Sequence, residues 1–381
     1  MKKVTILTDD LGYGGIEKSV SILANYLTNY AKVEVISLYK LYEEPAFSFN
    51  SKVNVKYLTE LKPNKLDIIY NLKNLKIFSF LLAVIEWLKI KIKSRKALID
   101  YISICDSNII ISTNRVLNKY LGNYKKDNVC AVAWEHFHHH DNIEYIKLLV
   151  KSLKNIDKLV VLSKSLADYY KKYFIDNNIN CTIEYIPDTL EEIPSDYTNY
   201  KNNNLIAVGK MTPRKAFEDL ITVFKLVDLK TNDVYLNLVG DGSSKNKVFK
   251  KIVDNNLTRK VHMYGYLPQK SINKLYKESS IFCMTSHTEA FGITLLEAMS
   301  YKLPIIAFDS AEGAKELIKN NYNGYLIKNR NEYEMADKIV ELLNNKKELK
   351  RLGENAYKTA LTYQKEEILK LWNKILALDE E

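Results

Sequence analysis

The sequence predicts an α/β protein built from two doubly wound domains, each around a parallel sheet. Apolar runs of strand length alternate with stretches of helical periodicity along most of the chain, which is the pattern of repeated strand and helix units. This pattern starts twice, at residues 4–8 and 205–209, and a polar stretch rich in Asn and Lys (191–204) lies between the two starts. With 381 residues, the chain is long enough for two sizeable cores.

Composition and charge limit the classes of protein that fit. Hydrophobic residues make up 46% and charged residues 27%, which is ordinary for a soluble protein. The four cysteines form no C-x-x-C pair and the N-terminus has no signal-peptide pattern, so we expect a cytoplasmic protein without disulfides. A net charge of +10 favours an anionic partner, such as nucleic acid, an acidic membrane or a phosphorylated substrate. No recognition motif is present and the basic residues do not interleave with aromatic ones, which argues against nucleic acid.

The first domain begins with the apolar strand at residues 4–8. A glycine loop, Gly12-Tyr-Gly-Gly15-Ile-Glu-Lys18, follows it, and apolar residues then recur at helical spacing: Val20, Leu23, Ala24 and Leu27. The loop is not the G-x-G-x-x-G fingerprint, so it does not predict a nicotinamide cofactor. Further strands are expected at residues 33–38 and 53–58.

Residues 77–96 differ from their surroundings. Residues 77–88 are almost continuously apolar, and five of the eight residues 89–96 are basic. The apolar run is shorter than the ~20 residues that a membrane span needs. On a helix its apolar residues (Leu81, Val84, Ile85, Leu88, Ile92) share one face between lysines, which suits an anionic membrane interface with Trp87 at headgroup level. A buried helix with a solvated basic end is the alternative.

Histidines cluster after one of the next strands. Strands are expected at 106–113 and 129–134, and the second leads into Glu135-His-Phe-His-His-His-Asp141. His136 and His140 would have the spacing of a metal site only on a helix, and a strand end argues against a helix. A solvated loop is the plainer interpretation for most of these histidines. A further strand is expected at 159–163.

The second domain repeats the strand, loop and helix pattern. The strand at 205–209 is followed by a basic loop with Lys210 and Lys215, and then by a helix. Strands at 235–239 and 261–265 come next. Near the C-terminus, a helix from Glu348 to Leu378 is expected to break near Thr362.

The most informative stretch is residues 281–300, which predicts a strand, a polar loop and a helix. Gly292 lets the backbone come close to a ligand, and the N–H groups of the following helix turn attract an anion such as a diphosphate. Glu289 lies before the helix and Glu297 roughly four residues into it, so one carboxylate flanks each side of a phosphate held there. Each carboxylate can accept hydrogen bonds from sugar hydroxyls. Two solvated acids at a helix start are the alternative.

Two glutamates eight residues apart, with Phe-Gly between them, resemble the paired-glutamate motif of family 4 retaining glycosyltransferases. Proteins of this family have the GT-B fold, in which two Rossmann-like domains face each other across a cleft. The resemblance implies that Glu289 grips hydroxyls of the donor sugar and that Glu297 holds the ribose of the nucleotide. It also implies that the backbone around Phe291, Gly292 and Ile293 meets the diphosphate.

Other positions extend this resemblance, weakly over residues 1–190 and strongly over 205–327. Lys215 matches the lysine of the family's phosphate motif, and Lys210 stands where arginine is usual and so lacks the bidentate fork. The loop with Gly15 is similar to one that lies against donor and acceptor. His136 occupies the place of a histidine that points at the donor sugar, with His138 and His140 as alternatives.

The resemblance also implies the domain plan. Residues 1–190 would form an acceptor-binding domain, and a C-terminal helix at about 363–381 would pack back on it. Residues 203–362 would form the domain that binds the nucleotide-sugar.

The function that the resemblance implies is retaining transfer of a hexose or N-acetylhexosamine from a nucleotide-sugar, with a UDP-sugar as the expected donor, to a lipid-linked or surface polysaccharide. No cofactor is expected. No Asp-x-Asp follows a strand, so no metal is invoked, and Lys210, Lys215 and the helix start at Gly292 would stabilise the leaving diphosphate. The expected location is cytoplasmic, peripheral on the inner face of the membrane. A catalytically silent subunit of a partner transferase, and a sugar-phosphate synthase or phosphorylase, are the alternatives.

Overall fold

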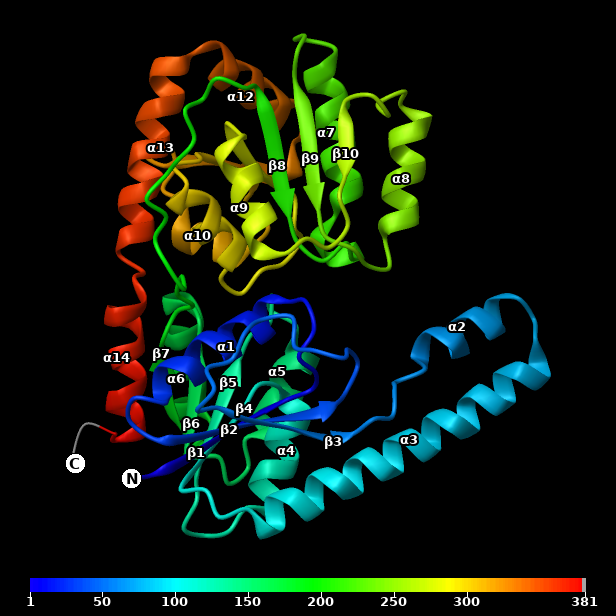
Figure 1. Cartoon of the computed structure of the whole chain (residues 1–381), viewed down its shortest axis with the longest axis vertical. Coiled ribbons are helices and arrows are strands. Elements are labelled where there is room, and N and C mark those ends of the chain that lie inside the picture. The colour runs from blue at the N-terminus through cyan, green and yellow to red at the C-terminus, as the bar shows by residue number, and fades with distance from the viewer. Residues whose placement is uncertain (379–381) are drawn as a thin grey trace. The chain divides into compact units, whose positions relative to one another are not determined.

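The computed structural model describes residues 1–378, except the side chain of Leu66. The chain divides into two compact units (Figure 1). Unit 1 comprises Met1–Val161, Ala167–Glu184 and the C-terminal segment that starts at Trp372. Unit 2 comprises Leu162–Leu166 and Tyr185–Leu371.

Unit 1 is built on a seven-stranded parallel sheet in the order β3-β2-β1-β4-β5-β6-β7. Its strands are β1 (Lys3–Thr8), β2 (Lys32–Tyr39), β3 (Asn54–Thr59), β4 (Ile109–Ser112), β5 (Cys130–Glu135), β6 (Lys158–Val161) and β7 (Thr182–Tyr185). Its helices are α1 (Gly15–Leu27), α2 (Lys65–Lys73), α3 (Ile77–Ile104), α4 (Arg115–Tyr124), α5 (Ile143–Ser152) and α6 (Lys164–Asp176). The strands predicted in this half of the chain are all confirmed, with small shifts at their ends.

The central strands of unit 1 are nearly continuous apolar runs because helices cover both faces of a parallel sheet. Val4, Ile6, Ile110 and Val132 have no exposed surface. The chain order reverses between β1 and β4, so the edge beyond the carboxyl ends of these two strands is the topological switch point of unit 1.

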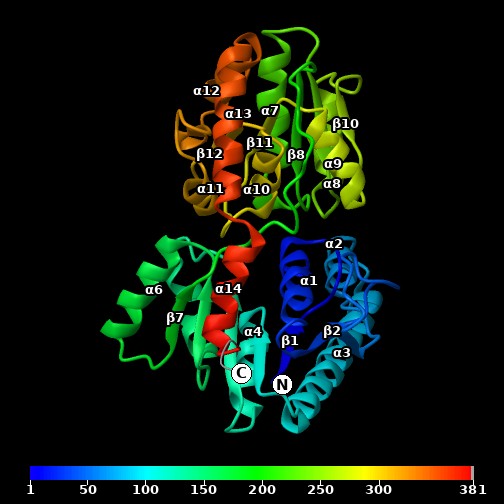
Figure 2. The same cartoon turned by 60° about the vertical axis from the view of Figure 1, so that its left-hand side comes forward.

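Unit 2 holds a six-stranded parallel sheet in the order β10-β9-β8-β11-β12-β13. Its strands are β8 (Asn204–Val208), β9 (Tyr235–Val239), β10 (Val261–Met263), β11 (Ile281–Met284), β12 (Ile305–Phe308) and β13 (Gly324–Ile327). Its helices are α7 (Phe217–Asp228), α8 (Lys245–Asp254), α9 (Gln269–Lys277), α10 (Ile293–Ser300), α11 (Glu312–Leu317), α12 (Glu332–Asn344) and α13 (Lys346–Leu361). Helix α7 packs against α8 and α12, while α10 packs against α11 and α13 (Figure 2).

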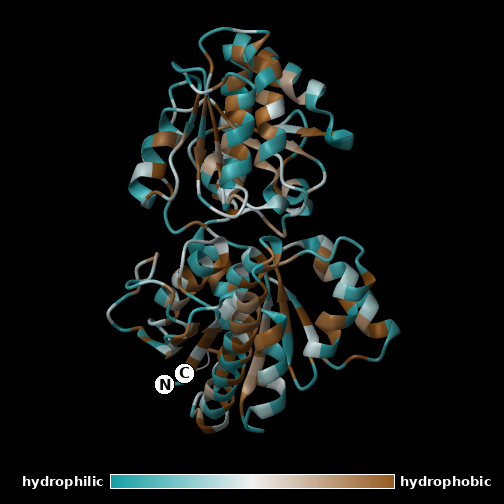
Figure 3. Ribbon diagram, turned by 90° about the vertical axis from the view of Figure 1, so that its right-hand side faces the viewer, coloured by the Kyte–Doolittle hydropathy of each residue, from teal (hydrophilic) through white to brown (hydrophobic). Residues whose placement is uncertain are grey.

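The switch point of unit 2 lies between β8 and β11. From β8 the chain continues to its neighbour β9 toward one edge of the sheet, and from β11 it continues to β12 toward the other edge. The loops that follow β8 and β11 therefore meet at one place along the carboxyl edge. Figure 3 shows hydrophobic residues concentrated on the strands inside each unit, whereas the helices alternate between hydrophobic and hydrophilic residues.

The C-terminal helical region breaks where the sequence predicts. Helix α13 ends at Leu361 and α14 (Lys365–Leu376) begins three residues after Thr362. The last turns of α14 belong to unit 1, where the Trp372 ring packs edge-on against Trp134 of β5, with ring centroids 4.9 Å apart. Lys158 of β6 donates a hydrogen bond to the carbonyl of Ile375 at 2.5 Å.

Candidate active site

The loop between β11 and α10 has the strand, loop and helix structure predicted for residues 281–300. Gly292, directly before α10, has φ +96° and ψ 63°, a left-handed conformation that costs little only for glycine. A Cβ there would come within 3.0 Å of Leu295 Cδ1 and 3.3 Å of Glu289 Cγ. The carbonyl of Gly292 accepts hydrogen bonds from the amides of Leu295 and Leu296. Helix geometry leaves the earlier amides, those of Ile293 and Thr294, without an acceptor inside the helix, so they can hold an anion.

Lys215 and Glu289 form an ion pair across the switch point of unit 2. Lys215 ends a short 3₁₀ turn (Pro213–Lys215) in the loop after β8, and Glu289 lies in the loop after β11. The side chains are 14% and 15% exposed, so both are largely buried and only a small part of each is open to a ligand. A cation and a hydroxyl-accepting carboxylate thus stand side by side near the start of α10.

Two hydrogen bonds to backbone carbonyls also join the two loops. Thr285 Oγ1 donates to the carbonyl of Ala216 at 2.8 Å, and the amide of His287 donates to the carbonyl of Arg214 at 2.8 Å. Ala216 itself is left-handed, with φ +48°. These bonds fix the position of Lys215 relative to the loop that carries Glu289.

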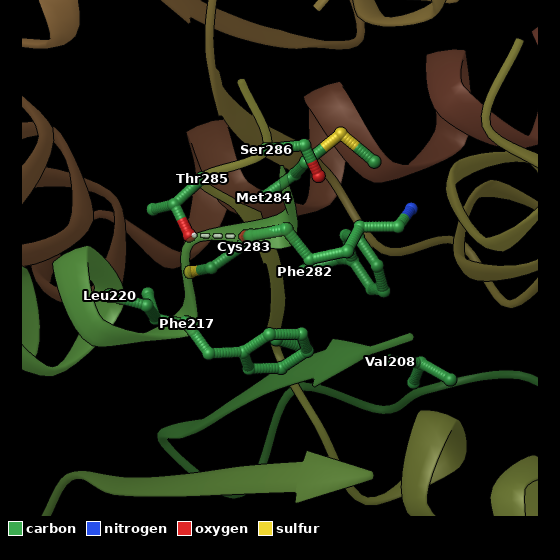
Figure 4. A pocket seen from close by; sticks show the side chains of 10 residues that line it. Val208, Phe217, Leu220, Phe282, Cys283, Met284, Thr285 and Ser286 are labelled. Atoms are coloured by element: carbon green, nitrogen blue, oxygen red, sulfur yellow. Dashed lines mark hydrogen bonds between the residues drawn. The ribbon is translucent and has the colours of Figure 1, made fainter. Parts of the chain in front are cut away.

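A small pocket lies behind this pair, at the carboxyl ends of β8 and β11 (Figure 4). Most of the residues that line it are apolar, including Val208, Phe217 and Phe282. Lys215, Thr285 and Ser286 supply its polar lining. The pocket thus borders Lys215 with mainly apolar residues of both strands and of α7.

Phe291 and Glu297 are held by packing inside unit 2. Phe291 is 1% exposed, and its ring lies edge-on to Tyr363 with centroids 5.4 Å apart. Glu297, in α10, is 7% exposed, and its Oε2 accepts a hydrogen bond from the buried Tyr276 hydroxyl at 2.9 Å. The Glu297 carboxylate is therefore oriented before any ligand arrives. Lys210 lies two residues after the end of β8 and its side chain is exposed.

Arg330, which the sequence analysis did not single out, supports the loop after β11 from beneath. Its guanidinium donates to the carbonyls of Thr285 (2.8 Å) and Ser286 (3.2 Å) and to the hydroxyl of Ser310 (2.8 Å). It also pairs with Asp219 of α7 at 2.5 Å. One planar side chain thus ties three segments together under the candidate site. The only signal in the sequence is a basic residue soon after a strand, which is too common to single it out.

In unit 1, Gly15 is the first residue of α1 and is exposed, and the loop before it is compact. The amide of Gly12 donates to Asp10 Oδ1 at 2.8 Å, and a Cβ on Gly12 would come within 2.4 Å of the Tyr42 ring. The predicted glycine turn before a helix is therefore present at the carboxyl end of β1.

His136 directly follows β5 and is 8% exposed. Burial lowers the pKa of its imidazole to about 3, so the ring is neutral at physiological pH. Among the described residues, its Nε2 is buried and has no hydrogen-bond partner. The ring centroid is 4.4 Å from that of Trp134.

Glu135, the last residue of β5, is fully buried beside His136. Its Oε1 accepts hydrogen bonds from the amide of Phe137 (2.8 Å) and the hydroxyl of Tyr145 (3.0 Å). Burial nevertheless raises the pKa of its carboxyl to about 7. Glu135 anchors the turn that carries His136 to helix α5.

The histidines after His136 do not form a metal site. Residues 136–142 are not helical, and no group of three metal-binding side chains occurs among residues 1–378. Nδ1 of His138 and of His139 accept backbone hydrogen bonds from His140 and Asp141. His140 and Asp141 are both left-handed, with φ +46° and +56°, so the loop is a tight turn stabilised by its own imidazoles.

Comparisons with known proteins give a consistent result. Residues 190–359 match the sequence model of the family "Glycosyl transferases group 1". The chain is 31% identical over 315 residues to the poly(ribitol-phosphate) alpha-N-acetylglucosaminyltransferase of Staphylococcus aureus, covering 80% of this chain and 60% of that protein's length. It is 27% identical to the amylovoran biosynthesis glycosyltransferase AmsD of Erwinia amylovora, over 99% of this chain and all of that protein.

Two solved structures have the same arrangement of elements. A variant of S. aureus TarM, in complex with fondaparinux, alpha-GlcNAc-glycerol and UDP, superposes with a TM-score of 0.78 at 20% identity, over 99% of this chain and 100% of that one. The pneumococcal O-GlcNAc transferase GtfA, in complex with UDP and GlcNAc, gives 0.76 at 13% identity, over 99% and 98%.

Proposed function

From a GT-B fold whose residues 190–359 match the glycosyl transferases group 1, we propose that this protein is a retaining glycosyltransferase of the family 4 type. It moves a hexose or N-acetylhexosamine from a UDP-sugar to a lipid-linked or surface polysaccharide. The relatives named above are a poly(ribitol-phosphate) alpha-N-acetylglucosaminyltransferase and a glycosyltransferase of amylovoran biosynthesis, and the solved neighbours were bound to UDP, which supports this choice. The observation that carries the proposal is the Lys215–Glu289 pair beside the start of α10.

The geometry of unit 2 suggests how the donor is held. The diphosphate lies against the amides of Ile293 and Thr294, where the helix dipole adds positive potential. Lys215 and the exposed Lys210 neutralise the charge that grows on the leaving diphosphate, so the proposed reaction needs no metal. The fixed positions of these groups lower the cost of reorganisation during transfer.

We assign the two glutamates to different parts of the same donor. Glu289 accepts hydrogen bonds from hydroxyls of the transferred sugar, and its pairing with Lys215 holds its carboxylate in place. Glu297, oriented by Tyr276, accepts from the ribose hydroxyls. His136 stays a predicted contact of the donor sugar, and its neutral imidazole suits hydrogen bonding to a hydroxyl.

The lipid-linked acceptor places the protein at the inner face of the membrane as a peripheral enzyme. No helix among the described residues has the length and apolar character of a membrane span.

The first experiment is thermal shift and donor hydrolysis with purified protein across UDP-, GDP- and ADP-sugars, without added metal. We expect UDP and one UDP-sugar to stabilise the protein, with slow hydrolysis of that sugar. Sugar phosphate and inorganic phosphate are included as acceptors, because use of either would favour the synthase or phosphorylase alternative. If no nucleotide stabilises the protein, a subunit that depends on a partner transferase becomes the better explanation.

The decisive variant is Glu289→Gln, which removes the charge and keeps the size of the side chain. We expect transfer to fall by about 100-fold or more, because a preorganised group at the reacting sugar is lost. Binding of UDP alone should change little. The control is Glu341→Gln on α12, which also removes a glutamate that pairs with a lysine, Lys338. Normal turnover by the Glu289→Gln variant would refute the assignment of the site.

A further inference from the structure

Helices α2 and α3 form a hairpin on unit 1 that leaves a large apolar surface uncovered. Helix α3 is 28 residues long and runs out from the sheet of unit 1, and α2 lies along its N-terminal half (Figure 1). The C-terminal half of α3 packs on the unit through buried residues, including Ile90, Leu98 and Ile102. The part of the hairpin that carries the exposed apolar residues is therefore distinct from the part that holds it in place.

Seven large apolar side chains of α3 are 46% to 75% exposed: Ile77, Phe78, Leu81, Leu82, Ile85, Leu88 and Ile92. At 100° per residue they fall within an arc of about 140°, opposite the buried face. Helix α2 and the turn after it add Ile69, Tyr70, Leu72 and Leu75, which are 39% to 84% exposed. A contiguous apolar surface of this kind marks an interaction site.

Val84 and Trp87, expected on the exposed face, lie elsewhere. Both are only half-exposed, and the Trp87 ring lies 4.4 Å under Nζ of Lys91, away from the strip. Trp87 thus lies on the side of the helix beside Lys91, and its position at headgroup level stays a prediction.

Basic residues border the strip. Lys89, Lys93 and Lys96 lie along one edge, and Arg95 and Lys91 lie along the other. Residues 62–100 contain nine Lys or Arg and three Asp or Glu, a surplus of six out of the net +10 of the chain. Most of the excess positive charge is thus concentrated on one apolar hairpin.

We propose that the α2–α3 hairpin docks on an anionic bilayer, with the exposed strip of α3 in the headgroup region and its basic borders against lipid phosphates. The helix lies in the plane of the interface, since its apolar face is one-sided. A second copy of the chain is a poorer occupant. A two-fold interface would bring the basic borders of two identical strips together with only three acidic residues per hairpin to offset them. This inference does not depend on the proposed donor site.

The test is co-sedimentation of the full-length protein with vesicles of phosphatidylcholine, with and without phosphatidylglycerol. We expect binding to the anionic vesicles only, weakening as salt is raised. The Leu81→Glu/Ile85→Glu variant should reduce binding by at least about tenfold. The matched control, Phe249→Glu/Val253→Glu, alters two exposed apolar residues of α8 and should bind normally.

A second pair of variants tests the charge. Lys89→Gln/Lys93→Gln/Lys96→Gln should weaken binding to anionic vesicles, whereas Lys147→Gln/Lys171→Gln/Lys172→Gln removes the same charge from exposed lysines elsewhere on unit 1 and should not. All variants should hydrolyse a soluble donor like the wild type, which separates this proposal from the donor site. Equal binding to neutral vesicles, or no effect of either α3 variant, would overturn the proposal. So would a dimer in analytical ultracentrifugation that the Leu81→Glu/Ile85→Glu variant dissociates.

Discussion

Burial moves the pKa values of two adjacent residues, Glu135 and His136, in opposite directions. The carboxyl of Glu135 holds its proton up to about pH 7, and the imidazole of His136 stays neutral down to about pH 3. Both residues are thus uncharged over most of the acidic range, although both carry ionisable groups. The turn after β5 therefore presents a neutral histidine held by a largely neutral acid.

These shifts predict opposing pH dependences of stability. Glu135 has a raised pKa in the folded state. Its contribution to the free energy of unfolding is therefore fully present below the ordinary glutamate pKa and is lost as pH rises toward 7. His136 has a lowered pKa, so the unfolded state binds more protons between about pH 3 and 6.5 and stability rises with pH there. In the wild type the two slopes partly cancel.

Single variants should separate the two slopes. Relative to wild type, Glu135→Gln should become progressively more stable between about pH 4.5 and 7, on the order of 3 kcal/mol in total. His136→Phe should show the reverse slope, since only the glutamate remains. The measurement is the free energy of unfolding against pH, followed by tryptophan fluorescence. Parallel profiles for the two variants would contradict the assignment.

At the scale of elements, the start of α10 depends on one glycine. Gly292→Ala places a side chain at φ +96°, against Leu295 and Glu289. We expect the loss of about 1–2 kcal/mol in stability and a weaker affinity for UDP, because the helix turn that offers its amides must shift. The control Ala298→Gly exchanges the same two residue types within the same helix and should lower stability without a specific loss of UDP affinity. Isothermal titration with UDP distinguishes the two outcomes.

The same elements show what the sequence can and cannot predict. Apolar runs and glycine positions predicted β11, the loop and α10, because strand burial and left-handed turns are local properties. The ion pair of Lys215 with Glu289 joins loops 74 residues apart, and only the resemblance brought these two residues to one site. Arg330 was missed since its partner Asp219 lies 111 residues away and no local pattern announces such a contact.

Helix α3 illustrates a different limit. Its helical character and basic flank follow from the sequence, but the choice between a buried and an exposed apolar face does not. Ile85 and Ile90 are both apolar and only five residues apart, yet one is 49% exposed and the other 6%. Which face is covered depends on the strands and helices of unit 1 that pack against the C-terminal half of α3.

At the scale of the whole molecule, the chain returns to its first unit at the end. Trp372 is 1% exposed and contacts Trp134, so Trp372→Ala should destabilise unit 1 by about 3–5 kcal/mol through the cavity that it leaves. Leu371→Ala, one residue earlier and 38% exposed, is the matched control and should cost well under 1 kcal/mol. Hydrogen exchange should show lost protection in unit 1 and little change in unit 2; uniform loss in both units would contradict this.

The position of Trp372 also has a consequence for biosynthesis. Trp134 leaves the ribosome 238 residues before the partner that covers it, an interval of roughly 10–50 s at ordinary rates of translation. For most of that interval, once β7 (Thr182–Tyr185) has been made, unit 1 has all its strands but still exposes the β5 surface on which α14 later docks. The first unit to be synthesised is therefore the last to be finished, and a ribosome that stalls before residue 372 releases a product with an uncovered tryptophan, a ready substrate for chaperones.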